Sequence, residues 1–248
     1  MKNKPLQYGY INTPIAPVTA LPKYSSEMIS QMLYGETLQI IEQAAGKWLK
    51  IISAYDNYTG YVYTSHVIII SKAAYNTYTL YLNTAPLHIT IPNGELLHLP
   101  IGSHCNGISH SKIMMPSSHT FEAKAFTKMA KKYLGTSYLW GGKSNYGIDC
   151  SGYTQTIFKF FNKPLPRDAW QQQLLGTTVH HWADAKVGDL AFFDNEKQEI
   201  IHVGIVLAKH CIIHAAGKVR IDALTHKGIY DKDNKLHTHK LHSIKRYF

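Results

Sequence analysis

The sequence predicts an α+β protein in which small β-barrels precede a domain with helices first and antiparallel strands afterwards. Short strand-like runs separated by turn residues fill the first 118 positions, and a helical pattern follows them. Further strand-like runs occupy the last third of the chain. The chain has 248 residues, of which 45% are hydrophobic and 12% aromatic, and this composition excludes a disordered protein.

Residues 1–70 have the pattern of a first small barrel. Two apolar strands between Leu38 and Ile52 are joined by a turn near Ala45-Gly46, and another turn at 56–60 precedes a third strand. Residues 71–118 repeat this pattern in weaker form, with a turn signal at 92–94. We therefore expect a second, degenerate barrel of the same type over 71–118.

Residues 119–248 form the predicted α+β domain. Thr120 can cap a helix that runs to about Leu134 and has apolar residues at positions 121, 125, 129 and 133. A second helix is expected directly after Cys150, ending near Asn162 and Pro164. Strands are expected at 188–194, 201–207, 211–216 and 219–222.

Cys150 is the candidate nucleophile because it stands at the predicted start of a helix. Unpaired backbone N–H groups and the helix dipole there favour the thiolate over the thiol. Glycines at four nearby positions allow close backbone approach to the sulfur, namely Gly141, Gly142, Gly147 and Gly152. A cysteine at a helix start is also compatible with a purely structural role.

His202 and His214 are the candidate partners of this cysteine. If their strands form a tight hairpin centred on Ala208, residues whose numbers sum to 416 lie opposite each other, and the two histidines satisfy that sum. Opposed side chains share a face of the sheet, with Cβ atoms about 4.5–5.5 Å apart. One imidazole can then orient the other, although a shift of one residue would place them on opposite faces.

The two other cysteines have weaker claims to chemistry. Cys211 lies among isoleucines without a helix end or glycines, so we expect it to pack in the core. Cys105 lies beside His104 and near His110, but their spacing fits no usual zinc pattern, and no metal site is expected.

The chain carries a formal charge of +10, with 26 basic and 16 acidic residues. The charge is dispersed and contains no long basic run, so a nucleic-acid partner is not expected. No apolar run approaches the roughly 20 residues that span a bilayer, and the N-terminus lacks the apolar segment of an ordinary export signal. These features favour a cytoplasmic location, or a periplasmic or secreted one if a signal was removed.

Residues from Gly135 to Asp222 resemble the NlpC/P60 family of papain-like cysteine peptidases. The resemblance rests on ordered motifs: Tyr138-Leu-Trp-Gly-Gly, Gly147-Ile-Asp-Cys-Ser-Gly, Leu165-Pro-Arg-Asp, Val187-Gly-Asp-Leu-Ala-Phe-Phe, Ile201-His-Val-Gly-Ile and Ile213-His-Ala-Ala-Gly-Lys-Val. It implies that Cys150 is the nucleophile, that His202 is the general base, and that His214 is the polar residue that orients the base.

The upstream part resembles the paired bacterial SH3-type barrels of the γ-D-glutamyl-L-diamino-acid endopeptidase branch of this family. That resemblance implies a peptidoglycan peptide with a free N-terminal L-alanine as substrate. Its implied substrate-binding residues are Glu27, Tyr58, Asp149, Ser151 and Trp140. Alternatives also fit these residues: a solvated acid at 27, a helix cap at 149, turn packing at 58 and a core tryptophan at 140.

The expected activity is cysteine-dependent hydrolysis of the γ-D-glutamyl–diamino-acid bond, without a cofactor. The alternatives are a related thiol amidase or acyltransferase on another wall-derived amide, and a non-catalytic wall-binding protein. Trp170 follows Arg167-Asp168-Ala169 where the family usually has a small or polar residue, so the adjoining subsite is expected to differ in shape.

Overall fold

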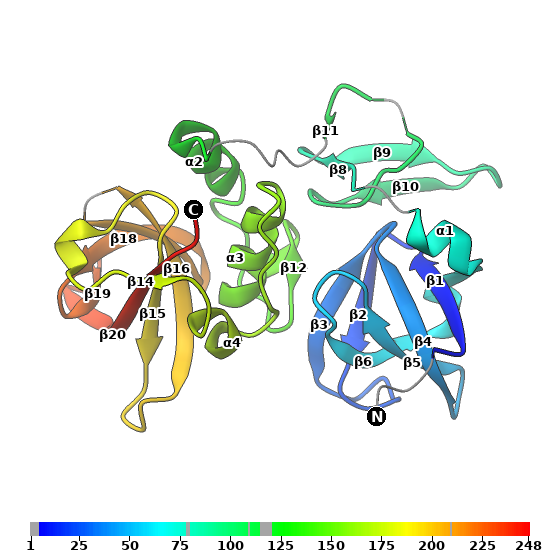
Figure 1. The fold of residues 1–248 in the computed structure, drawn as a ribbon, viewed down its shortest axis with the longest axis horizontal. Helices are drawn as coiled ribbons and strands as arrows, with labels where there is room; N and C mark the ends of the chain where they lie inside the picture. Colours follow the sequence, from blue (N-terminus) through cyan, green and yellow to red (C-terminus); the bar gives the residue numbers. More distant parts are fainter. Residues whose placement is uncertain (1–4, 78–79, 109, 115–120, 209) are drawn as a thin grey trace. The chain divides into compact units, whose positions relative to one another are not determined.

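A computed structural model describes residues 5–77, 80–108, 110–114, 121–208 and 210–248 (Figure 1). The chain divides into two compact units. The first contains the described residues up to 114 together with Trp140–Tyr146, and the second contains the described residues of 117–139 and 147–248. The predicted α+β class is confirmed, since both units are rich in strands and the helices cluster in the second.

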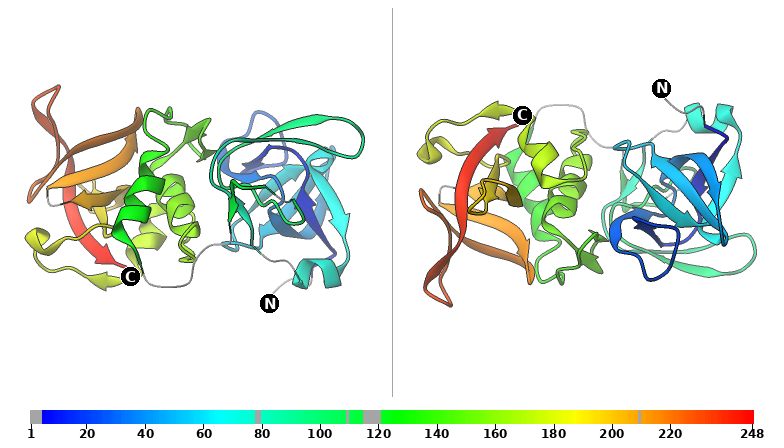
Figure 2. Two further views of the ribbon diagram at one scale, coloured as in Figure 1. Left: turned by 90° about the horizontal axis from the view of Figure 1, so that it is seen from above. Right: turned by 90° about the horizontal axis from the view of Figure 1, so that it is seen from below.

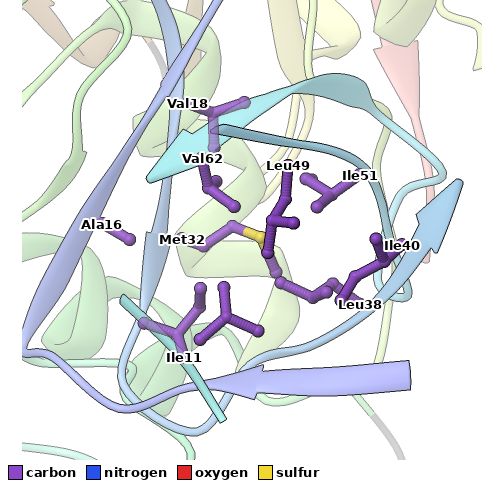
Figure 3. Packing of buried hydrophobic residues seen from close by; sticks show 10 residues of the cluster. Ile11, Ala16, Val18, Met32, Leu38, Ile40, Leu49, Ile51 and Val62 are labelled. Atoms are coloured by element: carbon purple, nitrogen blue, oxygen red, sulfur yellow. The ribbon is translucent and has the colours of Figure 1, made fainter. Parts of the chain in front are cut away.

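The first unit begins with a seven-stranded antiparallel sheet in the order β3-β2-β6-β5-β4-β1-β7. Its strands are β1 (Gln7–Ile11), β2 (Ile15–Thr19), β3 (Met28–Leu33), β4 (Thr37–Ala44), β5 (Trp48–Ser53), β6 (Thr59–Tyr63) and β7 (Val67–Ile70). Alternate side chains point inward, and the sheet curls around one apolar cluster that includes Ile11, Met32, Leu38, Ile51 and Val62 (Figure 3). The predicted first barrel is therefore present.

The described residues of 71–114 form smaller elements within the same unit. These are α1 (Lys72–Asn76), β8 (Leu82–Asn83), β9 (Leu87–Thr90), β10 (Leu96–Leu99) and β11 (Ile113–Met114). The strands pair in two separate two-stranded sheets, β9 with β10 and β8 with β11. Leu87, Leu97, Leu99 and Cys105 make a small core, against which Tyr34 from the first barrel also packs. The predicted domain boundaries at 70 and 118 stay predictions.

The second unit packs helices against an antiparallel sheet (Figures 1 and 2). Its helices are α2 (Ala123–Lys131), α3 (Cys150–Lys159) and α4 (Ala169–Gln173). Its short strands are β13 (Gly147–Ile148) and β14 (Thr177–Thr178). The partner of β13 is β12 (Lys143–Ser144), whose residues belong to the first unit. The longer strands are β15 (Leu190–Asp194), β16 (Ile200–Ala208), β17 (Cys211–Ala216), β18 (Lys218–Thr225), β19 (Gly228–Asp231) and β20 (Leu236–Arg246).

The sheet of the second unit has the order β14-β20-β15-β16-β17-β18-β19, and β20 also pairs with β19. The strands thus curl back on themselves, and α3 packs against β16 and β17 near the middle of the sheet. Apolar residues of α3 also pack against α2: the ring centroids of Phe158 in α3 and Phe126 in α2 are 5.4 Å apart. This packing fixes the start of α3 against the two central strands.

The helix predicted from Thr120 to Leu134 is shorter in the structure, because α2 covers only Ala123–Lys131 and a turn follows it. Glu122 stands at its N-cap, and Thr120 lies outside the described residues. The predicted end of α3 is correct in position, since Asn162 adopts a positive φ of 52° just beyond the helix.

Candidate active site

Cys150 is the first residue of α3, where the predicted helix start placed it. Asp149 caps the helix, and its carboxylate accepts a hydrogen bond of 2.7 Å from the backbone N–H of Gly152. The cysteine is 6% exposed. The backbone N–H groups of Val203 in β16 and of Ser151 hydrogen-bond to its sulfur. The sulfur therefore lies next to the residue that follows His202.

The expectation of a ready-made thiolate at this helix end is wrong. Burial, and to a lesser extent the negative charge of Asp149, raise the pKa of the Cys150 thiol to about 12. The hydrogen bond from Val203, the charge of Arg167 and the hydrogen bond from Ser151 oppose this rise without cancelling it. Removal of the sulfur from water thus outweighs the helix terminus. A base must take the proton when the thiol reacts.

His202 and His214 lie in direct contact, with 2.8 Å between His202 Nε2 and His214 Nδ1. The predicted register is wrong by two residues, because His214 pairs with Gly204 and Ile212 with Val206. The side-chain period of a strand is two, so a shift of two keeps both histidines on one face. His202 is consequently a diagonal neighbour of His214, and the two rings bridge the longer separation.

The position of Gly204 makes room for this diagonal pair. A Cβ atom at residue 204 would lie 2.8 Å from the Cβ of His214 and 2.7 Å from Cδ1 of Ile212. A side chain there would displace the histidine or the isoleucine. The glycine thus allows the His214 ring to reach across to His202.

Burial lowers the pKa of His202 well below its ordinary value, and the neighbouring His214 and His239 lower it further. The ring is therefore neutral at pH 7, as a general base requires. Its environment and that of Cys150 both favour the uncharged forms, so the resting pair is a thiol and a neutral imidazole.

The sequence did not point to two further groups at this site. Asp222 Oδ2 lies 2.8 Å from His214 Nε2, and Arg220 holds the same carboxylate. His239 in β20 stacks on His202, with ring centroids 4.2 Å apart at 30°, and burial lowers its pKa to about 4. The alternation of charges in β18 was a usable signal for Asp222, whereas His239 is one of 15 histidines.

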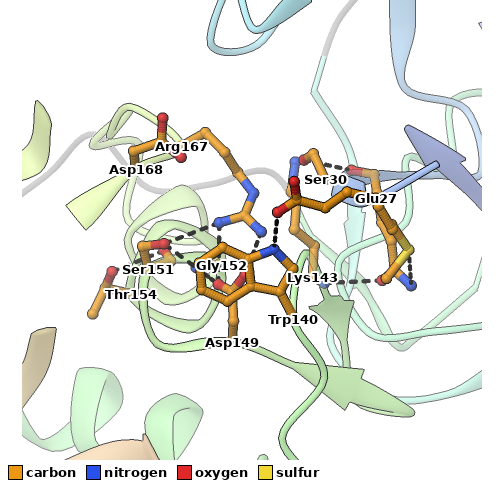
Figure 4. A network of polar contacts seen from close by, with 12 residues as sticks. Glu27, Ser30, Trp140, Lys143, Asp149, Ser151, Gly152, Thr154, Arg167 and Asp168 are labelled. Atoms are coloured by element: carbon orange, nitrogen blue, oxygen red, sulfur yellow. Dashed lines mark hydrogen bonds and ion pairs between the residues drawn. The ribbon is translucent and has the colours of Figure 1, made fainter. Parts of the chain in front are cut away.

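The carboxylate of Asp149 is already engaged within its own unit. Arg167, which is 2% exposed, donates to Asp149 Oδ1 at 3.1 Å and contacts the other carboxylate oxygen with its second nitrogen (Figure 4). The same arginine donates to Ser151 Oγ at 3.0 Å. The alternative role of Asp149 as a helix cap is therefore realised, and Arg167 is its buried counter-ion.

Glu27, Trp140 and Tyr58 belong to the first unit. Trp140 is 61% exposed, which rules out the core alternative, and its indole N–H donates to Glu27 Oε1 at 2.7 Å (Figure 4). Tyr58 is half-buried in the turn before β6, where its backbone N–H donates to Asp56. A joint role of Glu27, Tyr58 and Asp149 in binding an amine stays a prediction.

The remaining cysteines lie outside this constellation. Cys105 is buried in the small core of residues 71–114, whereas Cys211 is only partly buried at the first position of β17, against the expectation of core packing. Within the described ranges, we find no cluster of three potential metal-ligating side chains. The helices of the described residues also lack the combined length and hydropathy of a membrane span.

Comparison with known proteins identifies the family. Residues 135–239 match the NlpC/P60 family, and residues 20–67 match the bacterial dipeptidyl-peptidase Sh3 domain. The gamma-D-glutamyl-L-lysine dipeptidyl-peptidase of Bacillus subtilis (strain 168) is 30% identical over 82% of this chain and 78% of that protein. The chain belongs to the NlpC/P60 family. The predicted resemblance is thus confirmed, and the peptidases of this family are cysteine peptidases.

Two further similar proteins cover most of the chain. Dipeptidyl-peptidase 6 of Lysinibacillus sphaericus is 27% identical over 82% of this chain and 85% of its own. The crystal structure of an NlpC/P60 family protein from Bacillus cereus superposes with a TM-score of 0.81 at 18% identity, covering 97% of this chain and 99% of that one. At that identity the superposition shows a shared fold across both units.

Proposed function

We propose that this protein is a cysteine endopeptidase that hydrolyses the γ-D-glutamyl–diamino-acid bond of peptidoglycan peptides with a free N-terminal L-alanine. The contact between His202 and His214, beside a cysteine at the start of α3, is the observation that carries the proposal. The names of the Bacillus subtilis and Bacillus cereus relatives, both gamma-D-glutamyl-L-lysine dipeptidyl-peptidases, support this choice of bond.

In the proposed mechanism, the thiol of Cys150 attacks the γ-carbonyl carbon of D-glutamate while its proton passes to His202. Backbone N–H groups at the start of α3 stabilise the oxyanion. The tetrahedral intermediate collapses, the C–N bond breaks, and His202 returns the proton to the leaving amine. Water, deprotonated by His202, then attacks the thioester and releases the acid and the thiol.

Because Arg167 already neutralises Asp149, we assign the ammonium group of the substrate chiefly to Glu27. The carboxylate of Glu27 is exposed and oriented by the indole of Trp140. A charge-assisted hydrogen bond to an ammonium group is stronger than one between neutral partners. Glu27 would then select peptides whose first amine is unblocked, with Tyr58, Ser151 and Trp140 as the other proposed contacts.

The test is digestion of L-Ala-γ-D-Glu-L-Lys in three forms: free, N-acetylated and glycan-linked. We expect mass spectrometry to show L-Ala-D-Glu and lysine from the free form only, and Cys150→Ala to form no product. Cleavage by Cys150→Ala, or no cleavage by the wild type, would overturn the proposal. Products from another wall-derived amide alone would favour the alternative amidase or acyltransferase.

Recognition of the amine is tested separately with Glu27→Ala. We expect KM for the free peptide to rise about 10- to 150-fold with little change in kcat, since a lost charge-assisted hydrogen bond weakens binding by roughly 1.5–3 kcal/mol. Glu95→Ala, another exposed glutamate of the first unit, serves as the control and should leave KM unchanged. Equal kinetics of the wild type on free and N-acetylated peptides would contradict a role for the amine.

A further inference from the structure

A buried ion-pair network lies behind the two histidines. Asp222 is 8% exposed, and His214 Nε2 lies 2.8 Å from its Oδ2. Arg220 donates to both oxygens of this carboxylate, from Nε to Oδ2 at 2.7 Å and from Nη2 to Oδ1 at 2.8 Å. Arg220 Nη2 also lies 3.2 Å from Asp231 Oδ1 in β19. The carboxylate is therefore fixed from two sides.

We propose that Asp222, held by Arg220, is a positioning residue that determines which ring nitrogens of His214 and His202 carry hydrogen. The proposal rests on the proposed function, because it concerns the base of that reaction. Its consequence is that the second nitrogen of His202 is kept free of hydrogen and available to the thiol of Cys150.

The assignment follows from the donors and acceptors along the chain of contacts. An ionised carboxylate can only accept, so His214 Nε2 must carry the hydrogen of its bond to Asp222. A neutral imidazole has one N–H, so His214 Nδ1 is the acceptor for the N–H at His202 Nε2. His202 Nδ1 is then left with a lone pair. In the reverse arrangement of hydrogens, that nitrogen is protonated and is not a base.

The ionisation of Asp222 agrees with this assignment. Burial raises the pKa of its carboxyl, but the hydrogen bonds from His214 and Arg220 outweigh burial, and the net pKa is lowered. Other charged or titratable groups near His202, His214, Asp222 and Arg220 include Cys150 in α3, Cys211 in β17, Asp231 in β19, Asp233, and His239 in β20. The pKa of His239 is about 4, so this ring is neutral at pH 7.

The strand register makes the contact chain continuous. In β18, Arg220 lies directly opposite His214, and Asp222 lies opposite Ile212. Asp222 of β18 is therefore a diagonal neighbour of His214. On the other side of β17, Gly204 of β16 lies opposite His214, so His202 is also a diagonal neighbour of His214. The side chains of residues 202, 214 and 222 thus share one face of three adjacent strands and run across it in one diagonal line.

The decisive measurement is the ring ¹⁵N spectrum of the wild-type protein at pH 7, because it needs no substrate. We expect hydrogen on Nε2 of both His202 and His214. Hydrogen on Nδ1 of either ring as the main form would overturn the proposal, even if the protein cleaves the peptide. If both rings carry hydrogen on Nε2 but the protein does not cleave the peptide, only the proposed function is refuted.

A matched pair of variants separates positioning from a structural role. Asp222→Asn should lower kcat at least about tenfold with KM within about twofold, because an amide can present a donor to His214 and reverse the hydrogens. The rate of iodoacetamide labelling of Cys150 at pH 7 should fall in parallel. Asp222→Glu, which restores the carboxylate, should regain part of both rates.

Asp189→Asn is the control, because Asp189 is also buried and accepts from Nε and Nη2 of Arg246, yet none of its hydrogen bonds in the described residues is to an imidazole. We expect kcat and labelling within about twofold of the wild type. Equal losses in Asp189→Asn and Asp222→Asn, or full activity in Asp222→Asn, would refute the positioning role. If Asp222→Asn does not fold, the wild-type ¹⁵N spectrum still decides.

Discussion

We expect the buried ion pair of Arg167 and Asp149 to contribute strongly to the free energy of unfolding of the second unit. Both side chains are almost fully buried, at 2% and 4% exposure, and they share two contacts. Arg167→Met removes one partner and leaves the carboxylate buried without its counter-ion. Breaking a buried pair from one side costs about 3–5 kcal/mol of the free energy of unfolding. For a unit of this size, that lowers Tm by about 12–20 °C.

Asp149→Asn should cost a similar amount for the opposite reason, since Arg167 then becomes the uncompensated charge. Asparagine is a good N-cap, so the bond to Gly152 survives in this variant. The double variant with both substitutions removes both charges, and replacing a whole buried pair by residues of similar volume is often nearly neutral. We therefore expect the double variant to be about 3 kcal/mol more stable than the sum of the single effects predicts.

Urea unfolding of the four proteins, followed by circular dichroism, gives this coupling energy directly. Single effects that add to the double effect within about 0.5 kcal/mol would show that the two charges are not coupled. That result would refute the inference that Arg167 is the counter-ion of the helix that carries Cys150.

Three further predictions concern the base, its neighbour and the core. Because the pKa of His202 is lowered, the base stays neutral below pH 6.5. In a pH–rate profile, kcat/KM should therefore stay constant down to pH 6.5 and fall only at more acid pH. An acid limb with an apparent pKa above 6.5 would contradict this. Gly204→Ala should lower kcat more than tenfold, because the new Cβ displaces His214, while overpacking reduces the free energy of unfolding by about 1–3 kcal/mol; normal kcat would refute the steric argument. Phe126→Ala removes a fully buried ring that packs against Phe158 of α3 and should cost about 3–5 kcal/mol in urea unfolding; a loss below about 1 kcal/mol would show that this ring is not tightly packed.

The strands and the pair of histidines were predictable because the side-chain period of a strand tolerates an even error in register. The assumed pairing was displaced by two residues, yet His202 and His214 kept a common face. The ionisation of Cys150 was not predictable from its helix position, because desolvation depends on how deeply the folded chain buries the sulfur. Charges alternate along β18, but that pattern did not tie Asp222 to His214, because their contact depends on how a third strand pairs with β17.

The segment Trp140–Tyr146 belongs to the first unit although the chain on either side of it belongs to the second. Within the first unit, Trp140 binds Glu27, the backbone N–H of Lys143 donates to Gln31, and Asn145 accepts from the backbone of Ile101. These residues end only four positions before Cys150. A fragment that begins near residue 119 would therefore contain this loop without Glu27, Gln31 and Ile101, its hydrogen-bond partners in the first unit. The first unit therefore fixes the conformation of the loop that leads to the nucleophile.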